Sequence, residues 1–313
     1  MKDIYQQITD RMVEQLKKGN VPWQRPWVEA QNIVTQKPYR GVNTFVLACE
    51  ERESPFWMTY RQAVELGGNV KKGEKSTPII YWNFKDMKDD KGIVMLDSKG
   101  NPKQIPFIRW ANVFNLEQTE NIKAPELAKD GDTRLPLEKA QEILEKAQVC
   151  EMSLNAQLSG PCYIPLLDKV EVPSIQRYPN PALFYHSVFH ELAHATGHAS
   201  RLNREGITLP RGKERYAKEE LIAELSSSFL CNDAGILGEV EFKNSSAYIS
   251  SWLEALGNDP KLLIAASSSA QKAAEYVKGE REIQKKSTRE EILDMIVGSS
   301  STQNERGNEH ERE

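Results

Sequence analysis

Apolar residues recur at helical spacing near the start of this chain and along most of its second half. The first helix is expected over residues 4–16, where apolar residues stand four apart on one face: Ile4, Ile8, Met12 and Leu16. Thr59 and Gln62 fit a capping box, which predicts the start of another helix. Strands are expected near residues 76–84 and on both sides of a turn at residues 98–102, where β-branched and aromatic residues are frequent. Residues 1–116 are therefore predicted to form one α+β domain.

The second half has a different pattern. Residues 117–136 are polar and interrupted by proline and glycine, so they are predicted to be a linker. Residues 137–297 are predicted to form a mainly helical domain, with a hairpin near residues 162–175 and long helices near residues 181–196 and 214–231. Residues 298–313 contain no apolar side chain and are predicted to be a disordered tail. The expected fold class is α+β with two domains.

Charge and aromatic residues separate the two halves further. Residues 1–85 contain thirteen Lys or Arg and nine Asp or Glu, whereas the rest of the chain contains 28 and 36, so the net charge of −4 is unevenly spread. Five of the six tryptophans lie between Trp23 and Trp110. The first half is therefore basic and aromatic, and the second half is acidic and holds the histidines.

Composition favours a cytoplasmic protein without a membrane partner. Hydrophobic residues make up 39% and charged residues 27% of the chain. No apolar run approaches the roughly 18 residues of a membrane span, and the first residues lack the apolar core of a secretory signal. The four cysteines form no CxxC pair, which is typical of small buried residues in a reducing compartment.

Residues that can bind a metal or transfer a proton are most closely grouped in "HELAHATGH", residues 190–198. Asn180, followed by a proline, is a favourable helix start, and no helix breaker follows before residue 197. Residues four apart on such a helix share a face, so His190 and His194 can bind one metal ion. Only His190 is followed by glutamate, so only one register spells H-E-x-x-H. Glu191 is then placed to act on a bound water rather than to bind the ion.

The other two nearby histidines are weaker candidates. His186 lies one turn too early and lacks the following acid, so we expect it to pack near the site or to make a core hydrogen bond. His198 follows a glycine, but the extended pattern H-E-x-x-H-x-x-G-x-x-H needs a histidine where Ser200 stands. A catalytic zinc has three protein ligands, so the third should be a carboxylate on a later helix.

The helix expected near residues 214–231 supplies that carboxylate. Glu220 and Glu224 share a face flanked by apolar residues, whereas Glu219 points away and is expected to face solvent. We assign Glu220 as the third ligand, and Glu224 as the acceptor of a hydrogen bond from a ligating histidine. The reversed assignment of Glu220 and Glu224 stays open.

These residues predict metal-assisted hydrolysis, with Zn²⁺ as the cofactor and Mn²⁺ or Co²⁺ as alternatives. Zinc lowers the pKa of its bound water to about 7 and polarises a carbonyl. Glu191 would take the proton of the water and deliver it to the leaving amine. Tyr216 and Tyr185 are candidates for stabilising the oxyanion, and the hairpin could offer an edge strand to an extended peptide.

Basic and aromatic residues interleave in the first domain. This pattern suits single-stranded nucleic acid, because rings stack on bases and cations attract phosphates. The chain shows no helix-turn-helix or zinc-finger signature, in keeping with single-strand contact. The candidate contacts are Trp23, Arg25, Tyr39, Arg40, Asn43, Trp57, Tyr60, Lys71, Lys72 and Lys75.

Taken together, the chain resembles the ArdC-type antirestriction proteins of mobile elements. The matching segments run in the family's order from about residue 20 to about residue 280: "VPWQRPW", "PYRGVN", "FWMTYRQAVELGGNVKKGEKSTPIIYW", "VFNLEQTE", "HELAHATGHASRLNR", "YAKEELIAELSSSFL" and "SWLEALGNDPKLLIAASSSAQKAAEYV". One departure is visible, because "SSSAQKAAEYV" has serine where relatives often carry histidine.

The resemblance implies an N-terminal domain that binds single-stranded DNA without sequence preference. It also implies a C-terminal zincin-like metallopeptidase domain, similar to proteases that clear proteins crosslinked to DNA. The family's metal motif falls on His190, His194 and Glu220, with Glu191 as the catalytic acid/base. The implied role is protection of incoming single-stranded plasmid or phage DNA from host restriction.

Two functional hypotheses follow. In the first, the protein is a DNA-guided zinc metalloprotease whose protein substrate is unidentified. In the second, it protects DNA by coating the single strand, and its metal site is structural or vestigial. A DNA-mimicking inhibitor is disfavoured, because such proteins carry dense carboxylate runs whereas the first domain here is net basic.

Overall fold

The computed structural model describes residues 3–97, 100–126, 133–208, 213–242 and 246–280. The predicted tail at residues 298–313, the end of the second predicted domain and part of the predicted linker lie outside these residues. Contacts divide the chain into two compact units. One is built mainly from helices and the other around a sheet, which confirms the predicted α+β fold class. None of the described helices is long and apolar enough to cross a membrane.

The described part of the sheet unit comprises Gln31–Lys37 and Phe56–Ala124. Four strands lie in the order β1 (Gln31–Asn32), β2 (Phe56–Thr59), β5 (Gln104–Asn115) and β4 (Thr77–Asp86). β1 pairs with β2 in parallel, and the other pairs are antiparallel. β3 (Asn69–Val70) pairs with β6 (Thr119–Glu120), next to the short helix η2 (Leu116–Gln118).

The helix α3 (Tyr60–Glu65) begins at the predicted capping box. The Thr59 hydroxyl accepts from the Gln62 N–H at 3.2 Å, and the Gln62 side chain accepts from the Thr59 N–H at 2.9 Å. This closes the helix start beside β2. The buried core beneath it contains Ile33, Phe56, Met58 and Ala63.

One strand prediction is wrong. The segment before the turn at residues 98–102 makes only isolated bridges, Lys88 with Val94 and Leu96 with Pro102. β5 pairs instead with β4, from Thr77 opposite Val113 to Asp86 opposite Gln104. Residues 87–103 therefore have no continuous strand partner within the described part of the sheet unit.

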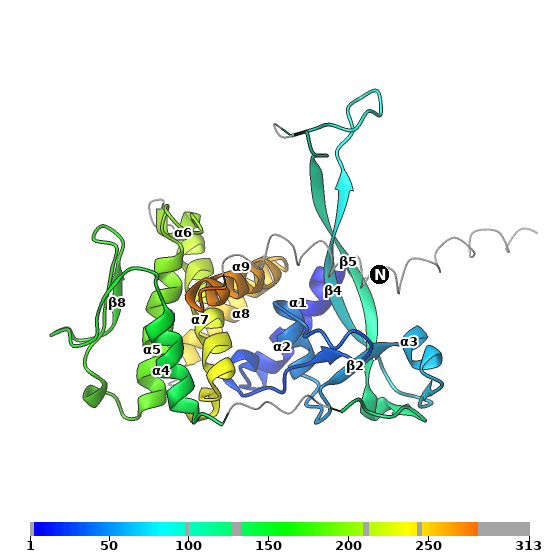
Figure 1. Ribbon diagram of the computed structural model, residues 1–313, viewed down its shortest axis with the longest axis horizontal. Helices are drawn as coiled ribbons and strands as arrows, with labels where there is room; N and C mark the ends of the chain where they lie inside the picture. The colour runs from blue at the N-terminus through cyan, green and yellow to red at the C-terminus, as the bar shows by residue number, and fades with distance from the viewer. Residues whose placement is uncertain (1–2, 98–99, 127–132, 209–212, 243–245, 281–313) are drawn as a thin grey trace, which may run out of the picture. The chain divides into compact units, whose positions relative to one another are not determined.

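The helical unit comprises Met1–Ala30, Pro38–Pro55 and Pro125–Arg281. Its longer elements are α1 (Ile4–Lys17), α2 (Val42–Ala48), α4 (Pro136–Lys146), α5 (Pro181–Thr196), α7 (Lys213–Ala234), α8 (Ser246–Asn258) and α9 (Leu262–Val277). Shorter ones are α6 (Glu205–Thr208), η1 (Pro22–Gln24), η3 (Ile175–Arg177) and η4 (Leu237–Glu239). α7 packs against both α5 and α9, and α5 and α7 run side by side in Figure 1.

A small sheet completes the helical unit. Its strands lie in the order β7 (Glu151–Ser153), β9 (Lys169–Glu171) and β8 (Cys162–Ile164). β8 and β9 form the predicted hairpin and pair antiparallel. β8 is an edge strand of this sheet and contacts α5.

The first helices of the chain pack in the helical unit rather than with the strands. Trp23 is fully buried, with its ring centroid 4.9 Å from that of Trp252 in α8. Phe45 stacks on Phe229 of α7, also at 4.9 Å. The division into compact units therefore differs from the predicted boundary at residue 116, because these aromatic contacts join the start of the chain to helices near its end.

Candidate metal centre

The helix α5 carries the H-E-x-x-H motif, and its start follows from its first residues. The Asn180 side chain accepts from the Leu183 N–H at 2.8 Å, and Pro181 occupies the first turn. This cap satisfies one of the free N–H groups at a helix start. The helix then runs unbroken to Thr196, and the Nε2 atoms of His190 and His194 lie 3.1 Å apart.

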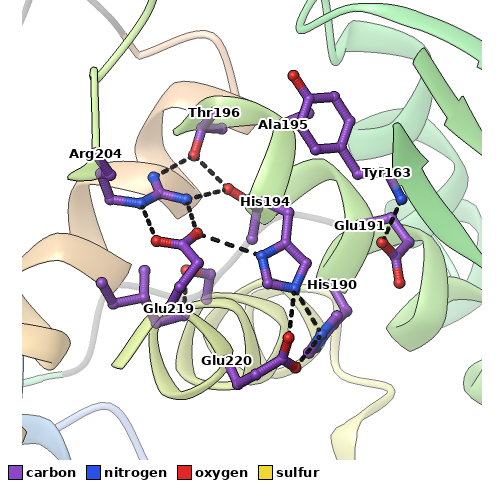
Figure 2. Close-up of polar contacts among 12 residues, drawn as sticks. Tyr163, His190, Glu191, His194, Ala195, Thr196, Arg204, Glu219 and Glu220 are labelled. Carbon is purple, nitrogen blue, oxygen red and sulfur yellow. Dashed lines mark hydrogen bonds and ion pairs between the residues drawn. The ribbon is translucent and has the colours of Figure 1, made fainter. Parts of the chain in front are cut away.

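The helix α7 brings Glu220 to the same point. One Glu220 carboxylate oxygen lies 3.5 Å from His190 Nε2, and the other lies 3.6 Å from His194 Nε2 (Figure 2). One ligand atom from each of the three residues lies within 4.8 Å of the others. Among the described residues, no other group of three His, Cys, Asp or Glu meets this criterion.

The three donors fit a divalent cation. Nitrogen and oxygen ligands bind zinc at about 2.0–2.2 Å, so two ligands of a tetrahedral ion lie about 3.4 Å apart. The two histidine nitrogens lie 3.1 Å apart, and each has one of the two Glu220 oxygens near it, at 3.5 and 3.6 Å, so every neighbouring pair of donors is close to that spacing. The side chains of His190, His194 and Glu220 keep 17%, 11% and 26% of their surface exposed, so a water or a substrate can reach the centre.

The charges around these donors favour a cation. Burial disfavours protonated His190, but hydrogen bonds to Glu220 and Glu224 and the charges of Glu224 and Glu191 outweigh it and raise the pKa of His190 to about 10. Burial also opposes ionised Glu220, yet its hydrogen bond with His190 and the nearby histidine charges lower its pKa to about 2. The centre thus stabilises positive charge, which a bound metal ion would supply in place of a proton.

Glu219 supports His194, and the expectation that it faces solvent is wrong. Its side chain is 4% exposed and its carboxylate lies 3.3 Å from His194 Nδ1. Arg204 donates two hydrogen bonds to that carboxylate, at 3.0 and 2.6 Å, and another to Thr196 at 2.7 Å (Figure 2). Burial raises the pKa of Glu219, but the hydrogen bonds from Arg204 and His194 lower it more. Glu219 therefore stays charged and orients the His194 ring.

Glu224 lies beside the other histidine. Its carboxylate is 3.7 Å from His190 Nδ1, on the side of the ring away from Glu220. Gln24 of η1 donates to the second Glu224 oxygen at 2.7 Å. A segment near the start of the chain thus fixes a carboxylate at the metal centre. The sequence gives no local signal for the roles of Gln24 and Arg204, because both depend on distant packing.

Glu191 faces the small sheet. Its side chain is buried, and one carboxylate oxygen accepts from the backbone N–H of Tyr163 at 2.7 Å (Figure 2). Tyr163 belongs to the edge strand β8, so the strand and the acid are linked directly. No local pattern in the sequence predicts this contact, because it joins residues 28 positions apart.

His186 has the core role that was expected of it. His186 is buried and shares a 3.0 Å hydrogen bond with Ser227, which confirms a core role. Burial lowers the pKa of His186 to about 4, despite the charge of Glu224. His198 Nδ1 lies 2.8 Å from the Ser200 hydroxyl, outside the three-residue centre.

The two oxyanion candidates are placed differently. Tyr185 is buried, and its hydroxyl donates to Gln141 at 2.8 Å, so it is engaged elsewhere. Tyr216 is 48% exposed, and a hydrogen bond from its side chain is among the causes that lower the pKa of Glu220. Only Tyr216 of the two therefore reaches the centre.

Four of the candidate DNA contacts are buried, which corrects the expectation that they meet a nucleic acid. Trp23, Trp57, Tyr39 and Asn43 are 0%, 2%, 7% and 9% exposed. The two tryptophans and the tyrosine pack in protein cores, so their ring faces cannot stack on bases without unfolding.

The other six candidates reach the surface: Arg25, Arg40, Tyr60, Lys71, Lys72 and Lys75. Three of these already have protein partners. Arg25 donates to the Asn20 side chain and lies 3.9 Å from Glu51, Arg40 forms an ion pair with Glu275, and Lys71 donates to the Glu117 carbonyl at 2.7 Å.

Two protein-family models match the chain. Residues 2–114 match the N-terminal domain of the anti-restriction factor ArdC, and residues 138–269 match a zincin-like metallopeptidase. The first match includes Gln24, and the second includes the whole H-E-x-x-H motif and Glu220.

The chain is also similar to two solved structures and to a primase. The metal-free crystal structure of the antirestriction protein ArdC from plasmid R388 is 32% identical, with a TM-score of 0.69, and the match covers 88% of this chain and 97% of that one. The Mn(II)-bound crystal structure of ArdC from R388 gives 30% identity and a TM-score of 0.71, over 90% and 100% of the two chains. DNA primase TraC of Escherichia coli is 34% identical over 310 residues, which cover 93% of this chain but 29% of that primase.

Proposed function

This chain belongs to the ArdC family of antirestriction proteins, and from that membership we propose that it is a metallopeptidase guided by single-stranded DNA. It would bind the single strand without sequence preference and hydrolyse protein at that strand. Its role would be to protect the incoming DNA of a mobile element from host restriction. The similarity to a DNA primase supports a role at DNA.

The observation that carries the enzymatic part is the convergence of two histidines and a glutamate beside a buried acid. His190, His194 and Glu220 would hold a divalent cation, because their donor atoms have the spacing of ligands to one ion. Zn²⁺ suits this donor set, with Mn²⁺ or Co²⁺ as alternatives. The Mn(II)-bound relative supports a divalent metal.

The ion would supply Lewis acidity, polarising a peptide carbonyl and lowering the pKa of a coordinated water to about 7. Glu191 would accept a proton from the attacking water and pass it to the leaving amine. The Tyr163 N–H orients the Glu191 carboxylate for this exchange. Tyr216 would donate to the developing oxyanion, and the edge strand β8 would pair with an extended peptide beside Glu191.

The DNA-binding part rests on the basic first half and on the exposed candidates Arg25, Tyr60, Lys72 and Lys75. Binding through phosphates makes affinity fall steeply with salt, because counterions are released. Salt-independent binding of single-stranded DNA would therefore contradict this part of the proposal.

The test is the substitution Glu191→Gln, which keeps the size of the side chain and removes its basicity. Protection of incoming DNA would be measured in cells, and metal content, DNA affinity and cleavage of a DNA-bound protein would be measured on the purified chain. Loss of cleavage and of protection, with metal content and DNA affinity unchanged, supports the enzyme. Full protection by Glu191→Gln would mean that coating of the strand protects the DNA, with the metal site structural or vestigial.

A further inference from the structure

The strands β4 and β5 form a ribbon that projects beyond the rest of the sheet unit. β2 pairs with β5 only at residues 113–115, whereas β4 and β5 stay paired out to Asp86 and Gln104 (Figure 1). From Pro78 and Asn112 outward, the ribbon therefore has no other strand partner among the described residues. A two-stranded ribbon has little core of its own. Large exposed aromatic residues on it are therefore not explained by packing within the ribbon.

The pairing register sorts the ribbon's side chains onto two faces. Directly paired residues and those two apart on one strand share a face. Trp110 lies opposite Ile80, and Trp82 lies opposite Ile108, so both tryptophans lie on one face, together with Phe84. Trp82, Phe84 and Trp110 are 38%, 39% and 52% exposed. We call these three residues the aromatic face.

The opposite face carries cations. Arg109 lies opposite Tyr81, and Lys85 lies on the same face four pairs further along, opposite Ile105. Lys103 lies beyond Lys85, and its carbonyl accepts from the Met87 N–H. All three cations are exposed, and no Asp or Glu lies on this face of the ribbon. The Arg109 guanidinium lies 5.7 Å from the centre of the Phe107 ring, so an aromatic ring underlies one of the cations.

We propose that the β4–β5 ribbon is the single-strand-binding arm of the protein, with bases stacked on the aromatic face. This inference rests on the proposed DNA-binding function and locates its main contact. The cations on the opposite face raise the electrostatic potential around the ribbon and attract phosphates. Asp86, at the outer end of the aromatic face, is hydrogen-bonded to Gln104 at 2.9 Å.

The spacing of the rings favours a single strand over a duplex. Residues two apart on a strand lie about 6.8 Å apart, which is about twice the 3.4 Å rise per base of a DNA strand in a duplex. Each ring at this spacing can stack on one base of a stretched single strand. In a duplex the base pairs are already stacked on one another, so no space is left for a ring between them. A second copy of the chain is a poorer occupant, because Lys85, Lys103 and Arg109 flank the free edges and charged side chains disfavour edge pairing.

The test compares full-length variants for binding to a labelled oligo(dT) of about 20 nucleotides, long enough for several stacked bases, at fixed salt. Trp82→Ala and Trp110→Ala should each weaken binding about 5- to 150-fold, the usual loss for one stacked base. Trp110→Phe should retain most of the affinity, because a phenyl ring still stacks. Leu66→Ala is the matched control, since Leu66 is also exposed (43%), belongs to the sheet unit and lies off the ribbon.

The outcomes separate this inference from the proposed function. If the unaltered protein binds oligo(dT) and both Trp→Ala variants bind equally well, the ribbon proposal is overturned while DNA binding stands. If the unaltered protein does not bind oligo(dT), the proposed DNA-binding function fails first. Unchanged DNA affinity together with a change in oligomeric state, measured by light scattering, would assign the ribbon to self-association and overturn the proposal. Far-ultraviolet circular dichroism and metal content should match in all variants.

Discussion

The buried pair of Arg204 and Glu219 should support both the fold and the metal centre, and Arg204→Met separates the two roles. The side chains of Arg204 and Glu219 are 9% and 4% exposed, and two hydrogen bonds join them. Arg204 also donates to Thr196 and to the Ala193 carbonyl. Methionine keeps most of the length of the side chain but leaves the carboxylate without its cation.

The expected cost is large, because removing one partner leaves an uncompensated buried charge. Breaking such a pair typically costs about 3–5 kcal/mol. For a unit of this size, each kcal/mol lowers Tm by about 2–4 °C, so Arg204→Met should lower Tm by about 6–20 °C. Metal affinity should fall about 10- to 100-fold, because Glu219 would no longer be held against His194.

Thermal unfolding of the metal-free protein and metal affinity by chelator competition measure the two effects. In the double variant Arg204→Met/Glu219→Met, much of the stability should return, because an apolar pair can replace a buried ion pair. Metal affinity should stay low, since His194 Nδ1 still lacks its acceptor. Lys18→Met, which breaks an exposed pair with Glu14, is the control and should leave Tm unchanged. A Tm loss for Arg204→Met no larger than that of the control, or full recovery of metal affinity in the double variant, would refute the reasoning.

Three further predictions concern other parts of the helical unit. The pKa of buried His186 is about 4 in the folded protein and about 6.5 in the unfolded chain. The folded state is therefore fully stable with respect to this group above pH 6.5, and it loses up to ~3 kcal/mol of stability as the pH falls to 4. His186→Gln should flatten that part of the denaturation profile, and an unchanged profile would contradict this. Gln24→Ala should weaken metal binding about tenfold in chelator competition, because Glu224 loses its hydrogen-bond donor. An unchanged metal affinity would show that Gln24 does not position Glu224. A fragment of residues 117–313 should aggregate, or should unfold at a much lower temperature than the full chain, because Phe229 and Trp252 lose their aromatic partners. A fragment with the Tm of the full chain would show that α1, η1 and α2 are dispensable for folding.

Local rules predicted the helix that carries the metal motif. The cap at Asn180 and the spacing of His190 and His194 depend on residues within one or two turns, so α5 follows from its own sequence. The capping box at Thr59 and Gln62 is a second case. The strand expected before residues 98–102 was wrong, because the choice of a strand's partner depends on pairing across the sheet rather than on propensity.

Candidate DNA contacts are harder to predict, because composition cannot separate a stacking ring from a core ring. Trp23 and Trp57 lie in basic, aromatic stretches, yet both are buried. One of the rings that pack on Trp23 belongs to Trp252, in a helix near the other end of the described chain. Trp82 and Trp110, which are exposed, have no local mark that distinguishes them from the buried pair. Only the pairing of β4 with β5 places them on one face.

Glu219 is buried because α7 has no solvated face at that point. An apolar stripe predicts a solvated acid only on a helix with one buried and one solvated face. α7 is contacted by α4, α5, α6 and α9, and residues 221–231 are buried on every side. An acid in such a helix cannot be solvated and must find partners, so both Glu219 and Glu224 turn to the histidines of α5. Each carboxylate then needs its own donor from outside the two helices, which Arg204 and Gln24 provide. The candidate metal centre therefore depends on a loop after α5 and on a segment near the start of the chain, which ties the family's N-terminal region to the zincin-like domain.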